Sequence, residues 1–222
     1  RRDALLAHLR DRGIGCNVYY PAPLHLQPAF GYLGLEPGDL RFIVYSMGQP
    51  IALSDALPIV EEMGCAVYTE RPYEAKLQSG ESFWLQDFHL RHESGTAIDV
   101  EAVSERFEQC FMAVLGGEAE NDGLNRLVVS AGLDWRQVTL LRCYAKHIQQ
   151  LALPFSQSYM EDVLVAHSDL AAALVRKFEV QFDPGLSRAR RKRELTDVSR
   201  QVRRGLRKAR NVDEDRILSA FA

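Results

Sequence analysis

A phosphate-binding loop is the first chemistry to look for, because glycines let backbone N–H groups approach a phosphate at the start of a helix. The sequence contains neither a G-x-G-x-x-G nor a Walker pattern. Gly13 and Gly15 begin the first pattern, but Val18 occupies its third glycine position. The segment also runs from a predicted helix into a predicted strand, which is the wrong direction. We therefore interpret Gly13 as a helix stop and predict neither catalytic nor cofactor-binding residues in this chain.

The histidines and cysteines do not have the spacing of a metal site. Only His89 and His92 are close together, at a predicted strand end where alternate side chains diverge. Four cysteines lie far apart without a C-x-x-C pair, which disfavours a disulfide framework and fits a reducing cytoplasm. His25 lies in a proline-rich loop, which is either plain structure or a ligand contact. We expect no metal ligands.

Two charged segments each admit two interpretations. The segment 118–126 contains three carboxylates, two amides and an arginine. Paired carboxylates can perform acid–base chemistry or bind a hard cation. The structural interpretation is favoured: Asn121 or Asp122 caps a helix, and Arg126 pairs with Asp122 four residues away.

The second charged segment, 183–210, holds 11 basic residues against three acidic ones. Such a stripe can bind phosphate, but it lacks aromatic partners for bases. An acid-rich helix at 99–122 offers an internal or inter-subunit counterpart. We therefore favour a solvated or subunit-contacting helix over nucleic-acid binding.

The composition is that of a soluble globular chain. There are 222 residues, 46% of them apolar, with 27 basic and 30 acidic side chains and a formal net charge of −3. This balance does not argue for nucleic acid or an acidic membrane surface as a partner, and we expect neither. The longest uncharged stretch, 13–35, is interrupted by three prolines and several polar residues. The sequence opens without Met or an apolar signal core, so we expect it to be a piece of a longer cytoplasmic protein.

The pattern of apolar residues divides the chain into three parts. Residues 1–12 predict a helix and 16–20 a strand, followed by irregular loop up to about Leu40. Strands are then predicted at 40–47, 65–69 and 82–90, with helices at 54–63 and 99–115. This β-α-β-β-α order predicts an α+β fold with a ferredoxin-like sheet.

The last part of the chain predicts helices throughout. They are expected at 122–131, 134–151, 156–166, 168–182, 186–210 and 213–221. Their short connections imply antiparallel neighbours in a bundle or array.

The beginning of the chain resembles the C-terminal region of the DegT/DnrJ/EryC1/StrS sugar aminotransferases. The resemblance rests on the segment Val18-Tyr19-Tyr20-Pro21-Ala22-Pro23-Leu24-His25-Leu26-Gln27-Pro28-Ala29-Phe30. That family uses pyridoxal phosphate on a lysine, and no lysine precedes Lys76. Of the family's residues only the His25 loop carries over, as a substrate contact.

Residues 40–222 resemble a different family, the large bacterial NAD-specific glutamate dehydrogenases. The matching words include Gly48-Gln49-Pro50-Ile51-Ala52-Leu53-Ser54-Asp55, Trp84-Leu85-Gln86-Asp87-Phe88, Ala119-Glu120-Asn121-Asp122-Gly123-Leu124-Asn125-Arg126-Leu127, Pro154-Phe155-Ser156-Gln157-Ser158-Tyr159 and Gln181-Phe182-Asp183-Pro184. The resemblance implies an ACT-like regulatory module followed by a helical region, both before a catalytic domain that lies outside this sequence.

Three domains and one function are therefore expected. Residues 1–39 are expected to form an aminotransferase-like appendage, 40–117 an ACT-like module and 118–222 a helical region. The appendage is either a genuine fusion, the product of a misassembled reading frame or a short coincidental likeness, and our hypothesis is that it is foreign to the rest and packs poorly on it. The resemblance implies a regulatory and assembly segment of a homo-oligomeric, NAD-dependent glutamate dehydrogenase, inactive alone and without bound NAD. A small amino-acid effector is expected near Leu53, Ser54 and Asp55, where a helix N-terminus can meet a carboxylate. A fragment of a pyridoxal-phosphate-dependent aminotransferase is the alternative.

Overall fold

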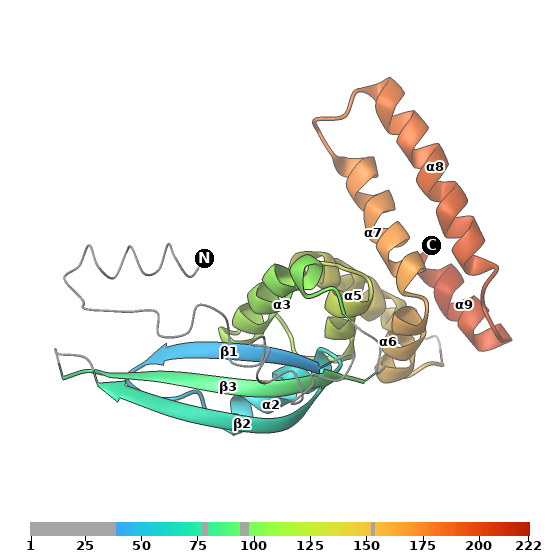
Figure 1. The fold of residues 1–222 in the computed structure, drawn as a ribbon. Coiled ribbons are helices and arrows are strands. Elements are labelled where there is room, and N and C mark those ends of the chain that lie inside the picture. Colours follow the sequence, from blue (N-terminus) through green and yellow to red (C-terminus); the bar gives the residue numbers. More distant parts are fainter. Residues whose placement is uncertain (1–38, 77–79, 94–97, 152–153) are drawn as a thin grey trace, which may run out of the picture. The chain divides into compact units, whose positions relative to one another are not determined.

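Three antiparallel strands form the only sheet in the described part of the chain. The computed structural model describes residues 39–76, 80–93, 98–151 and 154–222 (Figure 1). Strands β1 (Asp39–Met47), β2 (Cys65–Lys76) and β3 (Ser82–His92) lie in the order β1-β3-β2. The central strand β3 pairs with both neighbours, and Phe42 lies opposite Phe88. The predicted appendage 1–39, with His25, lies outside the described residues except for Asp39.

Helices α2 (Leu53–Glu62) and α3 (Val100–Leu115) share a core with one face of this sheet. Alternation along the strands turns Phe42 and Phe88 inward. The ring of Phe42 meets those of Phe107 and Phe111 edge-on, at centroid distances of 5.2 and 4.9 Å. The predicted β-α-β-β-α order and the α+β fold class are therefore confirmed.

Strand β2 is longer than the sequence indicates. The predicted strand stops at Thr69, whereas the observed strand continues to Lys76, opposite Ser82 of β3. A register shift between Val67 and Thr69 interrupts the pairing. Pro72 lies within the extension, which is possible because β2 is an edge strand and a proline there loses no ladder hydrogen bond.

The rest of the described chain is helical, as predicted. Its elements are a 3-10 turn η3 (Gly123–Arg126) and helices α4 (Leu127–Ser130), α5 (Trp135–Gln150), α6 (Gln157–Ala166), α7 (Ser168–Phe182), α8 (Arg188–Leu206) and α9 (Val212–Phe221). The helix predicted at 122–131 is thus a 3-10 turn followed by one α-helical turn. Helix α8 ends at Leu206, before the predicted end at 210, and Asn211, which is extended with φ −150°, caps α9.

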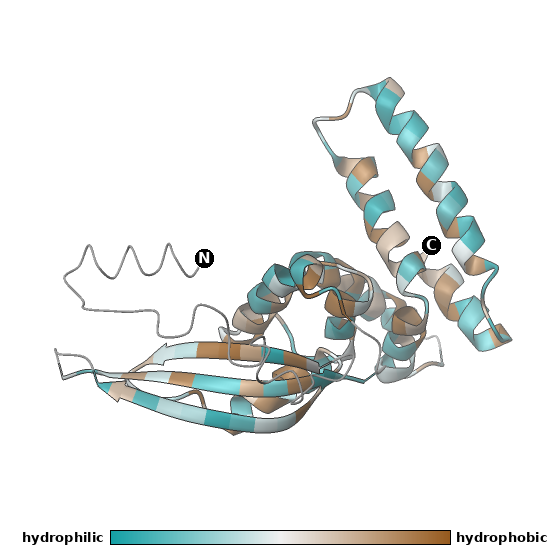
Figure 2. Ribbon diagram, in the orientation of Figure 1, coloured by the Kyte–Doolittle hydropathy of each residue, from teal (hydrophilic) through white to brown (hydrophobic). Residues whose placement is uncertain are grey.

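Side chains of the sheet module and the helical region meet in one continuous apolar core. Phe111 of α3, Leu124 of η3 and Leu141 of α5 all belong to it and are fully buried. Helix α8 is hydrophilic along most of its length and packs on α7 (Figure 2). A Cβ added at Gly205 of α8 would lie 2.9 Å from Leu170 Cδ1 of α7, so the glycine permits this close approach. None of the described helices is both long and apolar enough to cross a bilayer.

Candidate functional site

The loop that leads from β1 into α2 is fixed by two side chains of β3. The buried Gln86 accepts a hydrogen bond from the Ile51 N–H (2.7 Å) and donates to the Ile51 carbonyl (3.0 Å). Trp84 Nε1 donates to the carbonyl of Gly48 (3.2 Å), whose φ of 80° suits a glycine. The start of α2 is therefore held in place by the sheet.

The first turn of α2 contains the three residues predicted to meet an effector. Leu53, Ser54 and Asp55 are exposed, and Ser54 Oγ donates to Asp55 Oδ1 at 3.4 Å. The helix begins after Ala52, and no side chain among the described residues caps it. The N–H groups of Leu53 and Ser54 thus have no side-chain acceptor among the described residues, and such groups can donate to a carboxylate. Asp55 adds a negative charge that can receive an ammonium group.

The sequence did not single out the residues that position this turn. Gln86 was noted only within a family resemblance, although a polar residue two positions before the buried Phe88, and so on the same face of the strand, is a usable signal. A glutamine at an inward position of a strand needs polar partners. The side-chain carbonyl of Gln86 accepts from Ile51, and its amide donates to Ile51 and to Glu70 Oε1 (3.1 Å).

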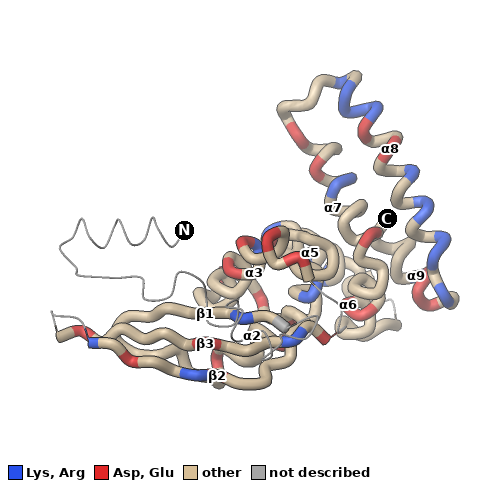
Figure 3. The backbone as a smooth tube through the Cα atoms, viewed as in Figure 1, with Lys and Arg blue, Asp and Glu red and all other residues tan. Residues whose placement is uncertain are grey.

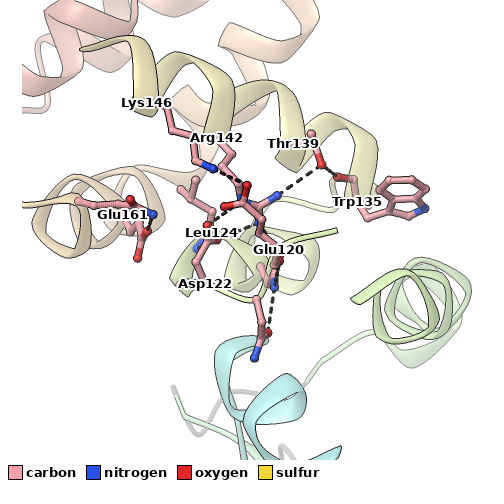
Figure 4. A network of polar contacts seen from close by, with 12 residues as sticks. Glu120, Asp122, Leu124, Trp135, Thr139, Arg142, Lys146 and Glu161 are labelled. Carbon is pink, nitrogen blue, oxygen red and sulfur yellow. Dashed lines mark hydrogen bonds and ion pairs between the residues drawn. The ribbon is translucent and has the colours of Figure 1, made fainter. Parts of the chain in front are cut away.

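The polar segment 118–126 forms a closed network rather than an open site (Figure 4). Asp122 caps η3 by accepting from the Leu124 N–H (3.1 Å). Arg142, only 3% exposed, donates to both oxygens of Asp122 (2.6 and 2.8 Å) and to Asn125 Oδ1 (3.0 Å). Burial lowers the pKa of Arg142, but the hydrogen bond and charge of Asp122 outweigh burial and leave the pKa raised. The structural interpretation of this segment is thus supported.

One predicted contact in this segment is wrong. Arg126 does not pair with Asp122; its Nη2 lies 2.6 Å from Asp162 of α6, and its Nε donates to the Gly123 carbonyl at 2.9 Å. The 3-10 turn replaces the expected α-helix, so the four-residue spacing no longer brings the two side chains together. Asp122 turns instead to Arg142, a residue 20 positions away.

A buried arginine in α5 also had a signal in the sequence. The buried face of α5 consists of Val138, Leu141, Ala145 and Ile148, and Arg142 lies on the same face. A charge at an apolar position of a helix implies a buried partner. The partner of Arg142 could not be predicted from the sequence, because its identity depends on how η3 packs against α5.

Among the described residues, the remaining candidates are not grouped as a metal centre. His89 and His92 lie on β3 with one facing each side of the sheet, as expected from their spacing. The described residues contain no group of three His, Cys, Asp or Glu side chains arranged to hold a metal ion. Burial raises the pKa of the Cys65 thiol to about 12 and that of Cys110 to about 11, which disfavours either as a nucleophile at neutral pH.

Comparison with known proteins gives two matches to one family. Residues 24–103 match the model described as glutamate dehydrogenase, ACT3 domain, and residues 119–184 match glutamate dehydrogenase, helical motif 3. The NAD-specific glutamate dehydrogenase of Pseudomonas aeruginosa is 37% identical over 196 residues, which cover 86% of this chain and 12% of that protein. The enzyme of the same name from Halomonas elongata is 37% identical over 163 residues, 73% of this chain and 10% of that protein.

A shorter similarity leads to a second family. The erythromycin biosynthesis sensory transduction protein EryC1 of Saccharopolyspora erythraea is 40% identical over 52 residues, 23% of this chain and 14% of that protein. Both predicted resemblances are therefore confirmed, and they differ greatly in extent. The domain boundaries at 39 and 117 stay predictions. The longer similarity is to the NAD-specific glutamate dehydrogenases, with an ACT3 domain matched at residues 24–103 and helical motif 3 at residues 119–184.

Proposed function

We propose that this chain is a non-catalytic regulatory and assembly segment of an NAD-dependent glutamate dehydrogenase. The reaction, oxidation of L-glutamate to 2-oxoglutarate and ammonia with hydride transfer to NAD, belongs to a catalytic domain elsewhere in a longer protein. NAD is expected there and not on this segment. The observation that supports this proposal is the joining of an ACT3-type module to helical motif 3 through one apolar core.

The regulatory role centres on the start of α2. A free amino acid carries a carboxylate and an ammonium group close together, and this turn offers complements to both. The N–H groups of Leu53 and Ser54 suit the carboxylate, and Asp55 suits the ammonium group. Because Gln86 already fixes the loop, the site needs little ordering when a ligand binds. Small amino acids are the expected effectors.

Calorimetric titration of the purified chain with glycine, L-alanine and L-serine tests this placement. Leu53→Pro removes one N–H at the first helical position, where proline is well accommodated. Ala52 has φ −63° and ψ 136°, a conformation compatible with a following proline. We expect Leu53→Pro to weaken binding about tenfold, the loss of roughly one charge-assisted hydrogen bond.

Leu53→Ala is the matched control, because it removes the same side chain and keeps the N–H. Its affinity should stay close to that of the unaltered chain. Equal affinities of the Pro and Ala variants would place the effector elsewhere. An apolar groove between β1 and α3, lined in part by Phe42, Val103 and Phe107, is then the next location to examine.

The catalytic part of the proposal has a separate test. The purified chain, incubated with L-glutamate and NAD, should produce no NADH absorbance. Turnover above a boiled control would contradict a non-catalytic role.

The similarity to EryC1 supports a second candidate, an aminotransferase fragment. That function requires pyridoxal phosphate bound as a Schiff base to a lysine. We expect this chain to show no absorbance of a pyridoxal phosphate Schiff base after incubation with pyridoxal phosphate and removal of the excess. A stable absorbance lost on borohydride treatment would favour the aminotransferase.

A further inference from the structure

The sheet is apolar on both of its faces. Phe42 and Val44 of β1 turn inward to the core that α2 and α3 share. Alternation therefore turns Ile43, Tyr45 and Met47 to the opposite face, where they are 41%, 58% and 57% exposed. An antiparallel sheet with one solvated face normally carries polar residues on that face. A group of large apolar side chains there indicates a surface that binds a partner.

The neighbouring strands extend this apolar surface. Residues directly opposite one another in an antiparallel ladder point to the same face. Leu85 of β3 lies opposite Tyr45 on one side and Tyr73 on the other, and Tyr73 is 52% exposed. Phe83 lies opposite Met47, and its ring stacks on that of Tyr45 at a centroid distance of 5.7 Å. We call this set of side chains the outer patch: Ile43, Tyr45, Met47, Tyr73, Phe83 and Leu85.

Charged side chains bound the outer patch at one end. Asp87, opposite Ile43, is only 7% exposed and accepts a hydrogen bond from Arg41 Nε at 3.1 Å. Arg71 of β2 is exposed and lies opposite Asp87 on the other side. Figure 3 shows the rest of β1, residues 42–47, without charge. The outer patch therefore carries no charge that would repel an identical copy, and its charged end suits the polar rim of an interface.

We propose that the outer patch packs against the outer patch of a second copy of this chain. The inference rests on the assembly role proposed above and deepens it by naming the surface that meets the second copy. Two sheets can pack face to face about 10 Å apart, with their facing side chains interdigitating. Helices α2 and α3 of each copy then lie on the outside of the dimer and do not obstruct the contact. A two-fold axis makes the contact isologous, so a dimer covers both patches and closes.

The size of the outer patch suits a homodimer. Its four most exposed side chains are about half exposed and present roughly 400 Å² between them, if a large side chain has about 200 Å². The partly exposed Phe83 and Leu85 raise this area to roughly 500 Å² in each copy. A two-fold contact buries that area twice, or about 1,000 Å², which is the size at which specific interfaces begin.

Sedimentation velocity of the full chain between about 1 and 100 μM tests the contact by mass action. We expect a dimer that persists at about 500 mM salt, because an apolar contact is not screened by ions. Tyr45→Lys/Tyr73→Lys should be monomeric, because the contact would then enclose two unpaired charges from each copy. Tyr45→Phe/Tyr73→Phe keeps the apolar rings and should still form the dimer.

Two methionines of equal exposure provide a matched control. Met47 lies in the outer patch and is 57% exposed, and Met112 of α3 lies outside it and is 58% exposed. Met47→Lys should raise the dissociation constant of the dimer about tenfold or more, and Met112→Lys should leave it unchanged. Circular dichroism confirms that each variant is folded. A chain that is monomeric throughout the concentration range, a dimer of Tyr45→Lys/Tyr73→Lys, or equal effects of the two methionine variants would overturn the proposal.

Dimerisation and effector binding are measured separately. A chain that binds an amino acid but stays monomeric refutes the contact between outer patches alone. A chain that dimerises as described but binds no amino acid supports that contact and refutes the effector site alone.

Discussion

Two helix starts in this chain differ in whether a side chain accepts hydrogen bonds from their first N–H groups. At η3, Asp122 caps the turn and Arg142 neutralises the carboxylate inside the protein. At α2, no described side chain caps the helix, and Leu53 and Ser54 are exposed. The polar segment 118–126 is therefore closed by its own partners, and the start of α2 has no side-chain acceptor for its first N–H groups among the described residues. Unsatisfied groups, and not the number of charges, indicate where binding can occur.

Removing Arg142 is expected to have the largest effect. Arg142→Met leaves Asp122 and Asn125 without their buried partner and should cost about 3–5 kcal/mol in the free energy of unfolding. Urea denaturation followed by circular dichroism measures this. Lys146→Met is the control: Lys146 forms an exposed ion pair with Glu120 and should change the free energy by less than about 0.5 kcal/mol. Similar costs for both variants would contradict the distinction between a buried network and surface charge.

Gln86→Leu should have an intermediate effect on stability. This variant tests how firmly the sheet holds the loop before α2. The substitution removes both hydrogen bonds to Ile51 and should cost about 1–3 kcal/mol. The same urea experiment on Gln109→Leu, which loses only an exposed bond to Glu105, should show about 0.5 kcal/mol or less. No difference between the two variants would show that the sheet does not fix the start of α2.

A third helix start extends the comparison to pH. The backbone N–H of Arg210 and the ring of His167 lower the pKa of Glu214 in the first turn of α9. A carboxyl group whose pKa is lower in the folded than in the unfolded chain stabilises the fold above its ordinary pKa of 4.5, and this contribution is lost as the pH falls through the folded value.

The melting temperature should therefore fall less steeply in acid for Glu214→Gln than for the unaltered chain. Differential scanning calorimetry between neutral pH and about pH 3 records this. Glu118→Gln, at an exposed glutamate, should follow the unaltered chain. Parallel curves for the unaltered chain and Glu214→Gln would mean that the pairing with His167 and Arg210 does not stabilise the fold.

Leu53→Pro should have the smallest effect on stability. Proline fits the first position of α2, and the N–H that it removes has no described side-chain acceptor. We expect a change below about 1 kcal/mol in urea denaturation, similar to that of Leu53→Ala. A loss of several kcal/mol in the free energy of unfolding that only the proline variant shows would reveal an internal partner for this N–H. It would contradict the proposed effector site.

Most of the fold was predictable, because its signals are local. Periodic apolar residues gave the order of the strands and helices, and Asp134, Ser156 and Asp99 cap helices at the expected places. The predictions fail where contacts with residues distant in the sequence determine the local structure. Strand β2 continues through Pro72 because β3 pairs with it, and the helix predicted at 122–131 yields to a 3-10 turn where Asp122 meets Arg142.

The candidate site shows the same division. The sequence alone determined that Leu53, Ser54 and Asp55 begin a helix, since consecutive residues stay together in any fold. Arg142 stands among the apolar positions of the helix predicted at 134–151, which is a signal for a buried partner that was not among the predictions made from the sequence. Only the tertiary structure decided that the partner is Asp122 and that Gln86 holds Ile51. These contacts join residues 20 and 35 positions apart, and their geometry depends on packing that no local pattern encodes.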